Sequence, residues 1–346
     1  MFRKKSIKTF IILLVIMSML ANTLGFVNAK PQDGNKTSTT KYGIIYFSTH
    51  NHYEPQYLTD QVLNRDFKLF KEQGFRYVTL PIIWKYFEPT KGSYNEDALD
   101  DIERVCNFAA KYKLKIIIEF YTMMQEDTFT MPTWLSPRKF EQVFLDPTIK
   151  QAWLNFQDHC ARRLNNIENI YSWHMMNEPA RKEWACDVSI EDFLELWTGM
   201  KTIFKSYSDR PVSIRFAAQV LDNPEHFNRD PRIYNLLDYV SLNWYEDHCS
   251  KEILESLVNQ IKTYTKVTIS EFGFSTDDDQ LQEQKYQEYI SLFKRIKINE
   301  CTAWMWRADY DSPNPEPAGT GFNLAKNIQG KPRPAFYLLT NTKPNN

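Results

Sequence analysis

Two short segments of the chain each place a glutamate at the end of an apolar run. The first is HMMNEP at residues 174–179, which contains Glu178, and the second is ISEFGF at residues 269–274, which contains Glu271. Hydrolysis of a glycosidic bond needs two carboxyl groups on opposite sides of it, one to protonate the leaving oxygen and one to stabilise or capture the developing cation. The two glutamates are candidates for this pair. The alternative is that each one caps a helix or pairs with an arginine.

The elements that position these glutamates recur in a regular order. Eight short apolar runs, rich in β-branched and aromatic residues, predict buried strands. Their ranges are 43–48, 76–83, 114–121, 170–178, 211–218, 239–245, 267–274 and 301–307. Helix-like stretches separate most of them, and this alternation predicts an α/β fold, a single-domain (β/α)8 TIM barrel. A doubly wound open sheet is the alternative, but it would more often carry a glycine-rich turn after its first strand, where this chain reads STHNH.

Local signals support the predicted helices. Apolar residues at positions 99, 102, 106 and 109 share one helical face. The segment Ser189 to Asp192 has the pattern of a capping box, and Gly74 stands where a helix would end. The connection after the fifth apolar run is the weakest, because residues 223–235 leave room only for a short helix.

The predicted barrel gives the two glutamates a common place. Active sites of this fold lie at the C-terminal ends of the strands. Glu178 ends the fourth run and Glu271 lies close to the end of the seventh. Both side chains are therefore expected at one opening, on opposite sides of it.

The motifs as a set resemble those of the large clan of retaining glycoside hydrolases with (β/α)8 barrels, and the cellulase-like family 5 is the nearest type. The segments that carry the resemblance are WHMMNEP at 173–179, SEFG at 270–273, WKYFEP at 84–89, GSY at 92–94 and GKPRPAF at 330–336. The resemblance implies hydrolysis of a β-linked glycan by double displacement. It also implies roles for single residues: Glu178 as general acid/base, Glu271 as nucleophile, Asn177 holding the sugar 2-hydroxyl, Tyr245 hydrogen-bonded to the nucleophile, and Trp306 as the floor of the central sugar subsite.

The chain departs from the cellulase-like pattern at three positions. Relatives usually carry an arginine on the second strand, where this chain has Thr79, and Arg215 in the fifth run is a candidate replacement. Tyr121 and Asn243 stand where relatives often have histidines. These two residues, together with His50 after the first run, are predicted substrate contacts.

The substrate class follows from the resemblance. A β-glucan or a β-mannan is favoured, cut within the chain along a cleft. The segment PTWL at 132–135 resembles β-galactosidase-like branches of the clan, so an exo-acting β-glycosidase is the alternative. The predicted loops 122–146 and 309–333 belong to the catalytic face, where they wall a cleft or close a pocket.

Two other classes of function stay open. His50 and His52 resemble the start of metal-dependent barrel hydrolases, which would also need further ligands, and the ends of the fourth and fifth runs offer no histidine or lysine. The second class is a carbohydrate-binding barrel without turnover. It is supported by the absence of the second-strand arginine, where this chain has Thr79. The main prediction is a hydrolase that needs no cofactor and no metal.

The N-terminal residues resemble a targeting segment. A basic start is followed by an apolar stretch at 10–27 and by small Ala29, which predicts a signal peptide over 1–29, or else an uncleaved anchor. Residues 30–41 are polar and predict a flexible tether, which leaves 42–346 as the catalytic barrel. The protein is therefore expected to be secreted or tethered at the extracellular surface, with membrane contact only through an uncleaved leader.

Composition narrows the partners. The net charge of −1 and the lack of a basic block argue against nucleic acid. Aromatic residues make up 15% of the chain, which suits stacking against sugar rings. An oligo- or polysaccharide substrate and a monomeric state are expected. Of the five cysteines, Cys186 and Cys249 fall in predicted loops and are the candidates for a disulfide.

Overall fold

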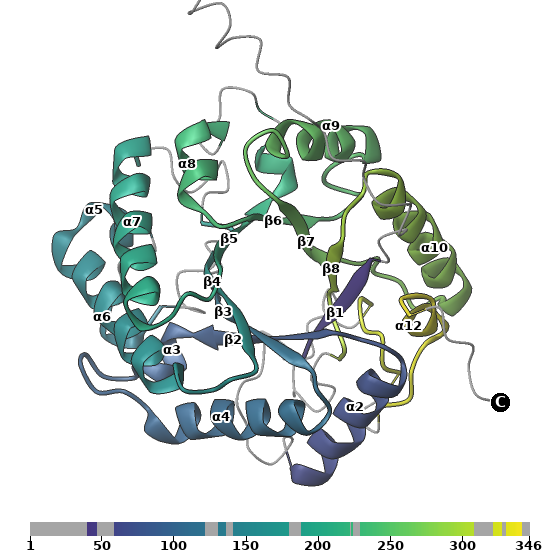
Figure 1. Cartoon of the computed structure of the whole chain (residues 1–346), viewed down its shortest axis with the longest axis horizontal. Helices are drawn as coiled ribbons and strands as arrows, with labels where there is room; N and C mark the ends of the chain where they lie inside the picture. Colours follow the sequence, from purple (N-terminus) through teal and green to yellow (C-terminus); the bar gives the residue numbers. More distant parts are fainter. Residues whose placement is uncertain are drawn as a thin grey trace, which may run out of the picture. The chain divides into compact units, whose positions relative to one another are not determined.

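Eight parallel strands form a closed barrel in the order of the chain (Figure 1). The computed structural model describes residues 40–46, 59–121, 131–135, 141–179, 188–221, 223, 229–307, 321–326 and 330–340. The strands are β1 (Lys41–Ile45), β2 (Tyr77–Ile83), β3 (Lys115–Tyr121), β4 (Ile170–Asn177), β5 (Val212–Ala217), β6 (Val240–Trp244), β7 (Val267–Phe272) and β8 (Glu300–Ala303). The predicted (β/α)8 barrel is confirmed.

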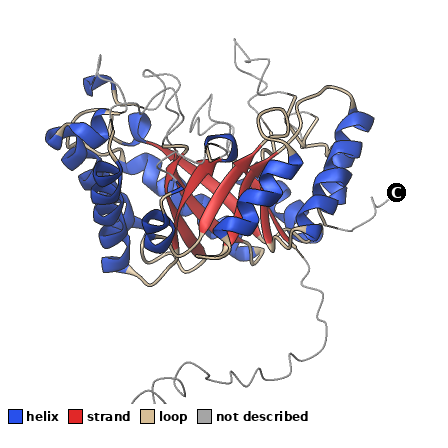
Figure 2. Ribbon diagram, turned by 90° about the horizontal axis from the view of Figure 1, so that it is seen from above, coloured by secondary structure: helices blue, strands red, loops and turns tan. Residues whose placement is uncertain are grey.

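Helices surround the strands on the outside of the barrel (Figures 1 and 2). The longer ones are α2 (Asp60–Glu72), α4 (Glu96–Lys111), α6 (Pro147–Leu164), α7 (Ile190–Tyr207), α9 (Lys251–Ile261) and α10 (Asp279–Arg295). The shorter ones are α3 (Trp84–Phe87), α5 (Gln142–Leu145), α8 (Pro231–Leu236), α12 (Pro334–Leu338) and the 3₁₀ turns Thr133–Leu135 and Ala218–Val220. The helix of the fifth unit, α8, is short, as predicted.

The local signals in the sequence have the expected structures. The capping box is present, because Ser189 accepts from the backbone of Asp192 and the Asp192 side chain accepts from the backbone of Ser189. Gly74 follows α2 with a φ of 87°, a conformation that favours glycine. The predicted apolar face of α4 is buried against the barrel.

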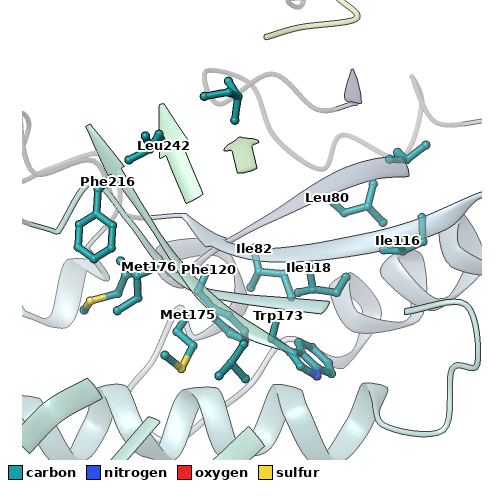
Figure 3. Packing of buried hydrophobic residues seen from close by; sticks show 14 of the residues in the cluster. Leu80, Ile82, Ile116, Ile118, Phe120, Trp173, Met175, Met176, Phe216 and Leu242 are labelled. Carbon is teal, nitrogen blue, oxygen red and sulfur yellow. The ribbon is translucent and has the colours of Figure 1, made fainter. Parts of the chain in front are cut away.

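The hydrophobic core lies between the barrel and its helices. Outward-facing strand residues such as Leu80, Ile118, Phe120 and Trp173 are fully or almost fully buried there (Figure 3). Each apolar side chain of this size contributes about 1.5–3 kcal/mol when it is removed from water. This layer holds the strands in register, so the barrel interior is free to carry polar groups.

The interior of the barrel is polar and closely hydrogen-bonded. The Ser241 hydroxyl lies 2.9 Å from that of Ser213 and 3.1 Å from that of Thr268. The Tyr239 hydroxyl lies 2.8 Å from Nε2 of His174. His174 is only 2% exposed, so this histidine is part of the polar interior.

Two β-bulges interrupt the alternation of side chains just before the candidate glutamates. In β4 the register against β5 shifts between His174 and Asn177, and Met175 and Met176 both face the outer core (Figure 3). In β7 the pairing with β6 passes from Ile269 to Glu271 and skips Ser270. Bulges re-aim the residues that follow them, and here those residues are the candidate catalytic groups.

The start of β1 bears on one predicted boundary, the end of the tether. Lys41 begins β1 and pairs with Glu300, so the predicted tether of residues 30–41 ends before its last residue. The predicted leader, residues 30–39 and Cys186 lie outside the described residues. Among the helices that the structure does describe, none is both long and apolar enough to cross a bilayer.

Candidate active site

The two candidate glutamates lie at the C-terminal ends of β4 and β7, within the arc of neighbouring strands β4 to β7 (Figure 1). Glu178 directly follows β4 with a φ of 46°, in the left-handed region that side-chain-bearing residues rarely adopt. Its backbone N–H donates to the Arg215 carbonyl at 2.7 Å, which fixes this conformation. Backbone conformations of this kind cost about 1–3 kcal/mol and gather at functional sites.

Asn243 on β6 links the two glutamates. Its Nδ2 donates to Oε1 of Glu178 at 3.0 Å and to Oδ1 of Asn177 at 2.9 Å. Its Oδ1 accepts from Arg215 at 3.2 Å and from Ser270 at 2.8 Å. The two N–H donors and two lone pairs of the amide are thus all engaged. The prediction that Asn243 contacts substrate is wrong, because no hydrogen-bonding capacity of its side chain is left for a sugar.

Arg215 on β5 is the cation of the site. Its Nη2 donates to Oε1 of Glu271 and to the Ser270 carbonyl, both at 2.7 Å. Its Nη1 pairs with Glu119 on β3, and all of these side chains are almost completely buried. Arg215 therefore supplies from the fifth strand the positive charge that the resemblance places on the second strand, where Thr79 stands.

Both oxygens of Glu271 are held. Oε1 accepts from Arg215, and Oε2 accepts from the Tyr245 hydroxyl at 2.7 Å, so the predicted hydrogen bond from Tyr245 is present. Burial raises the pKa of Tyr245 well above its ordinary value, which keeps its hydroxyl protonated as a donor. The Glu271 carboxyl is therefore fixed in orientation before any substrate arrives.

Among the described residues, Glu119 and Glu271 both pair with the guanidinium of Arg215, and the carboxyl of Glu178 acts on both of them. Burial raises the pKa of Glu271 to about 8 and that of Glu119 to about 7, and Arg215 opposes both rises. The charge of Glu178 raises the pKa of each of them further. With every carboxyl ionised, this group of four side chains would be left with two uncompensated negative charges. Burial and repulsion between neighbouring carboxyls therefore hold the pKa values of Glu119 and Glu271 above the ordinary range of a carboxyl.

The aromatic floor of the site is not where the resemblance placed it. Trp306 is fully buried and packs edge-on against Phe70 with ring centroids 5.0 Å apart, so the prediction that it floors a sugar subsite is wrong. Trp304, which directly follows β8, is partly exposed and lies nearly parallel to Tyr121, at 18° and 6.5 Å. The strand ends at Ala303, so Trp306 lies beyond β8 rather than within it, as the predicted run 301–307 had placed it.

Of the remaining predicted site residues, the structure describes Tyr121 and Asn177 but not His50. Tyr121 ends β3, is 4% exposed and faces Trp304. Asn177 is 2% exposed and its side-chain oxygen is bound to Asn243. His50 lies outside the described residues, as does His52. Within the described ranges no cluster of three or more His, Cys, Asp or Glu side chains is arranged to hold a metal ion.

Two further residues join the site. Glu119, on β3, is an ion-pair partner of Arg215. Phe322, in the segment after β8, packs against Tyr245 with ring centroids 5.5 Å apart. A side chain on Gly273 would meet the Trp304 carbonyl at 2.6 Å and Phe322 at 2.9 Å. Glycine at this position therefore allows the β8 segment to close over the end of β7.

A closed barrel with two glutamates at the C-terminal ends of the fourth and seventh strands, joined by a hydrogen-bonded polar cluster, defines the class of barrel glycoside hydrolases. The model of the cellulase family, glycosyl hydrolase family 5, matches residues 32–310. The chain belongs to this family, whose members are retaining O-glycosyl hydrolases. Among curated proteins, none matches the chain.

Solved structures share the fold at low identity. The exo-β-1,4-mannosidase Op5Man5 from Opitutaceae bacterium strain TAV5 has a TM-score of 0.74 and 15% identity, over 87% of this chain and 58% of that one. A GH5_18 protein from Streptomyces cattleya, solved with Manβ1-4GlcNAc, has a TM-score of 0.73 and 12% identity, over 88% and 80%. A β-glucosidase, 1317, has a TM-score of 0.62 and 15% identity, over 81% and 87%. The chain thus spans less than two thirds of the first of these proteins.

Proposed function

We propose that this protein is a retaining β-glycoside hydrolase in which Glu178 is the general acid/base and Glu271 is the nucleophile. The observation that carries the assignment is the way Glu271 is held, with one oxygen on Arg215 and the other on Tyr245. A carboxylate so oriented is prepared for attack on an anomeric carbon. The Glu178 carboxyl accepts from Asn243 and its side chain is partly exposed, which suits a group that must exchange protons with substrate and water.

The first chemical step forms a glycosyl-enzyme ester. Glu178 donates its proton to the glycosidic oxygen while the Glu271 carboxylate attacks the anomeric carbon, and the aglycone leaves as an alcohol. Formation of the ester removes the negative charge of Glu271. Glu178, now a carboxylate, then takes a proton from water, which attacks the same carbon and releases Glu271. The two inversions give net retention.

The substrate is proposed to be a β-linked glucan or mannan. The family match supports a β-glycoside. Of the similar structures, one is an exo-β-1,4-mannosidase, one was solved with Manβ1-4GlcNAc, and a third is a β-glucosidase. An exo-acting β-glycosidase is the second candidate, and the exo-mannosidase neighbour favours it. A screen over β-glucans, β-mannans, β-xylans and aryl β-glucosides, β-mannosides and β-galactosides tests the proposal. Sizing the products separates internal from terminal cutting, and no turnover of any of these would refute the function.

We further propose that the protein acts outside the cytoplasm, secreted or tethered at the surface. The basic and apolar N-terminal residues support this. N-terminal sequencing of protein recovered from the medium and from membranes would test it: a start at Lys30 supports a cleaved leader, and protein found only in the cytoplasm would contradict export.

The reassignment from Trp306 to Trp304 predicts opposite defects for two alanine variants. Trp304→Ala should lower kcat/KM at least about tenfold with little change in thermal stability, because a partly exposed ring at the site contacts sugar and supports little core. Trp306→Ala should lower the free energy of unfolding by roughly 3–5 kcal/mol, because it empties a fully buried position. Denaturant unfolding and steady-state kinetics on both proteins give the comparison. Equal stability losses in the two variants would contradict the reassignment.

A further inference from the structure

Glu119 is a buried carboxyl for which the double-displacement chemistry has no direct use. It lies on β3, is fully buried, and pairs with Nη1 of Arg215. The other end of the same guanidinium holds Glu271 through Nη2. A guanidinium is planar and keeps its charge, so its two terminal nitrogens bring one positive charge to both carboxyls at once. Glu119 and Glu271 therefore compete for one positive charge from strands on different sides of the barrel.

The surroundings of Glu119 offer no second cation within the described residues. The ionisable side chains that interact with it or with its guanidinium come from β3 to β7. They are Tyr121, His174, Glu178, Arg215, Tyr239, Tyr245 and Glu271. Burial and Arg215 lower the pKa of His174 well below its ordinary value, so this histidine adds no charge. Among the described residues, Arg215 is thus the positive group with which both Glu119 and Glu271 pair.

We propose that Glu119 is a positioning residue that acts through Arg215 to set the pH range in which the nucleophile Glu271 is ionised. The proposal rests on the proposed function for the meaning of Glu271. While Glu119 is ionised, half of the guanidinium charge is committed to it, and the ionisation of Glu271 is less favourable. A neutral group at position 119 leaves the whole charge to Glu271, which then ionises at lower pH.

The test is the pH profile of kcat/KM, which reports the ionisations of the free enzyme. Glu119→Gln keeps the shape of the side chain without its charge and should move the acidic limb to lower pH by at least about one unit. The double variant Glu119→Gln, Arg215→Met removes the cation as well, so its acidic limb should move to higher pH. The single variant leaves Arg215 paired with Glu271, whereas the double variant leaves Glu271 without its cation, so thermal unfolding must show that each variant is folded before its pH profile is compared. Glu88→Gln is the control, since Glu88 is 2% exposed and bound by Trp84 and Gly92; its acidic limb should not move.

A second measurement needs no activity. Glu119 and Glu271 have raised pKa values in the folded protein, so between about 4.5 and about 8 they bind more protons in the native than in the unfolded chain, and their contribution to stability should fall as pH rises through this window. The lowered pKa of His174 acts in the opposite direction, so the slope is read as the difference between each variant and the wild type. Glu119→Gln should flatten this fall, and its effect should not add to that of Glu271→Gln, since the two carboxyls are coupled. The proposal would be overturned if the acidic limb of the kcat/KM profile of Glu119→Gln stayed in place or moved to higher pH. It would also be overturned if the effects of Glu119→Gln and Glu271→Gln on the pH dependence of stability were additive. If the wild type hydrolyses no β-glycoside, the proposed function is refuted. The coupling between Glu119 and Glu271 can still be measured from the pH dependence of stability.

Discussion

Replacement of Glu271 by alanine should abolish hydrolysis of β-glycosides, with kcat reduced by about 10⁴-fold or more. The reason is that no other described carboxyl is held at the end of β7, and without it no glycosyl ester forms. Azide should partly restore turnover of an activated aryl β-glycoside, because a small anion fits the space that the carboxyl leaves. It attacks the face that Glu271 occupied, so the product should be the α-glycosyl azide. Product configuration by NMR and initial rates with and without azide are the measurements.

The matched control for this variant is again Glu88→Gln. Glu88 is as buried as Glu271, but it binds the Trp84 indole at 2.6 Å and the Gly92 backbone at 2.7 Å, away from the described catalytic cluster. Its loss should leave kcat within about threefold of the wild type once both proteins are shown to be folded by thermal unfolding. Turnover of Glu271→Ala near that of the wild type would remove the basis of the nucleophile assignment.

Replacement of Glu178 by alanine should give a defect that depends on the leaving group. Substrates that need protonation of the departing oxygen should lose about 10²–10⁴ in kcat/KM. Aryl glycosides with acidic phenols should lose much less in the first step, so that the glycosyl-enzyme accumulates and a burst of phenol appears. Azide should accelerate its breakdown and give the β-glycosyl azide, with retained configuration. The measurement is a series of aryl glycosides with phenols of graded pKa.

The opposite azide anomers from the two variants distinguish the two glutamates more sharply than rates do. A β-azide with Glu271→Ala, or an equal loss on all leaving groups with Glu178→Ala, would reverse or reject the roles. Asn243 binds Glu178 directly, so loss of this hydrogen bond accompanies the change. Asn243→Ala with Glu178 intact shows how much of the defect comes from that bond alone.

Most of the fold could be read from the sequence. Runs of β-branched and aromatic residues separated by amphipathic stretches report burial on both faces of a strand and on one face of a helix, and these are local properties. All eight strands lie at their predicted places, with ends that differ by a few residues. Ladder pairing with neighbouring strands sets those ends, as in β1, which begins at Lys41 because this residue pairs with Glu300.

The positions of the candidate residues were predicted where they depend on a place at a strand end. Glu178, Glu271 and Tyr245 lie where the sequence placed them, and the catalytic roles of the two glutamates stay predictions. The predictions for Trp306 and Asn243 were wrong, because their roles depend on which way each side chain points and on which groups already occupy it. No sequence signal separated Trp304 from Trp306, because the predicted last run, 301–307, contains both and only the structure ends β8 at Ala303. For Glu119 the signal was the cost of burying a carboxyl without a partner, which called for a cation such as Arg215.

By itself, then, the chain determined a barrel and the pair of acidic groups at its mouth, because strand order and strand ends follow from periodicity along one dimension. Only the tertiary structure decided how those groups are held. The bulges in β4 and β7 shift the alternation of side chains, and they become visible only when a strand is paired with its neighbour. The sharing of Arg215 between Glu119 and Glu271 joins residues from three strands. No spacing in the sequence encodes that contact, since it depends on the closure of the sheet.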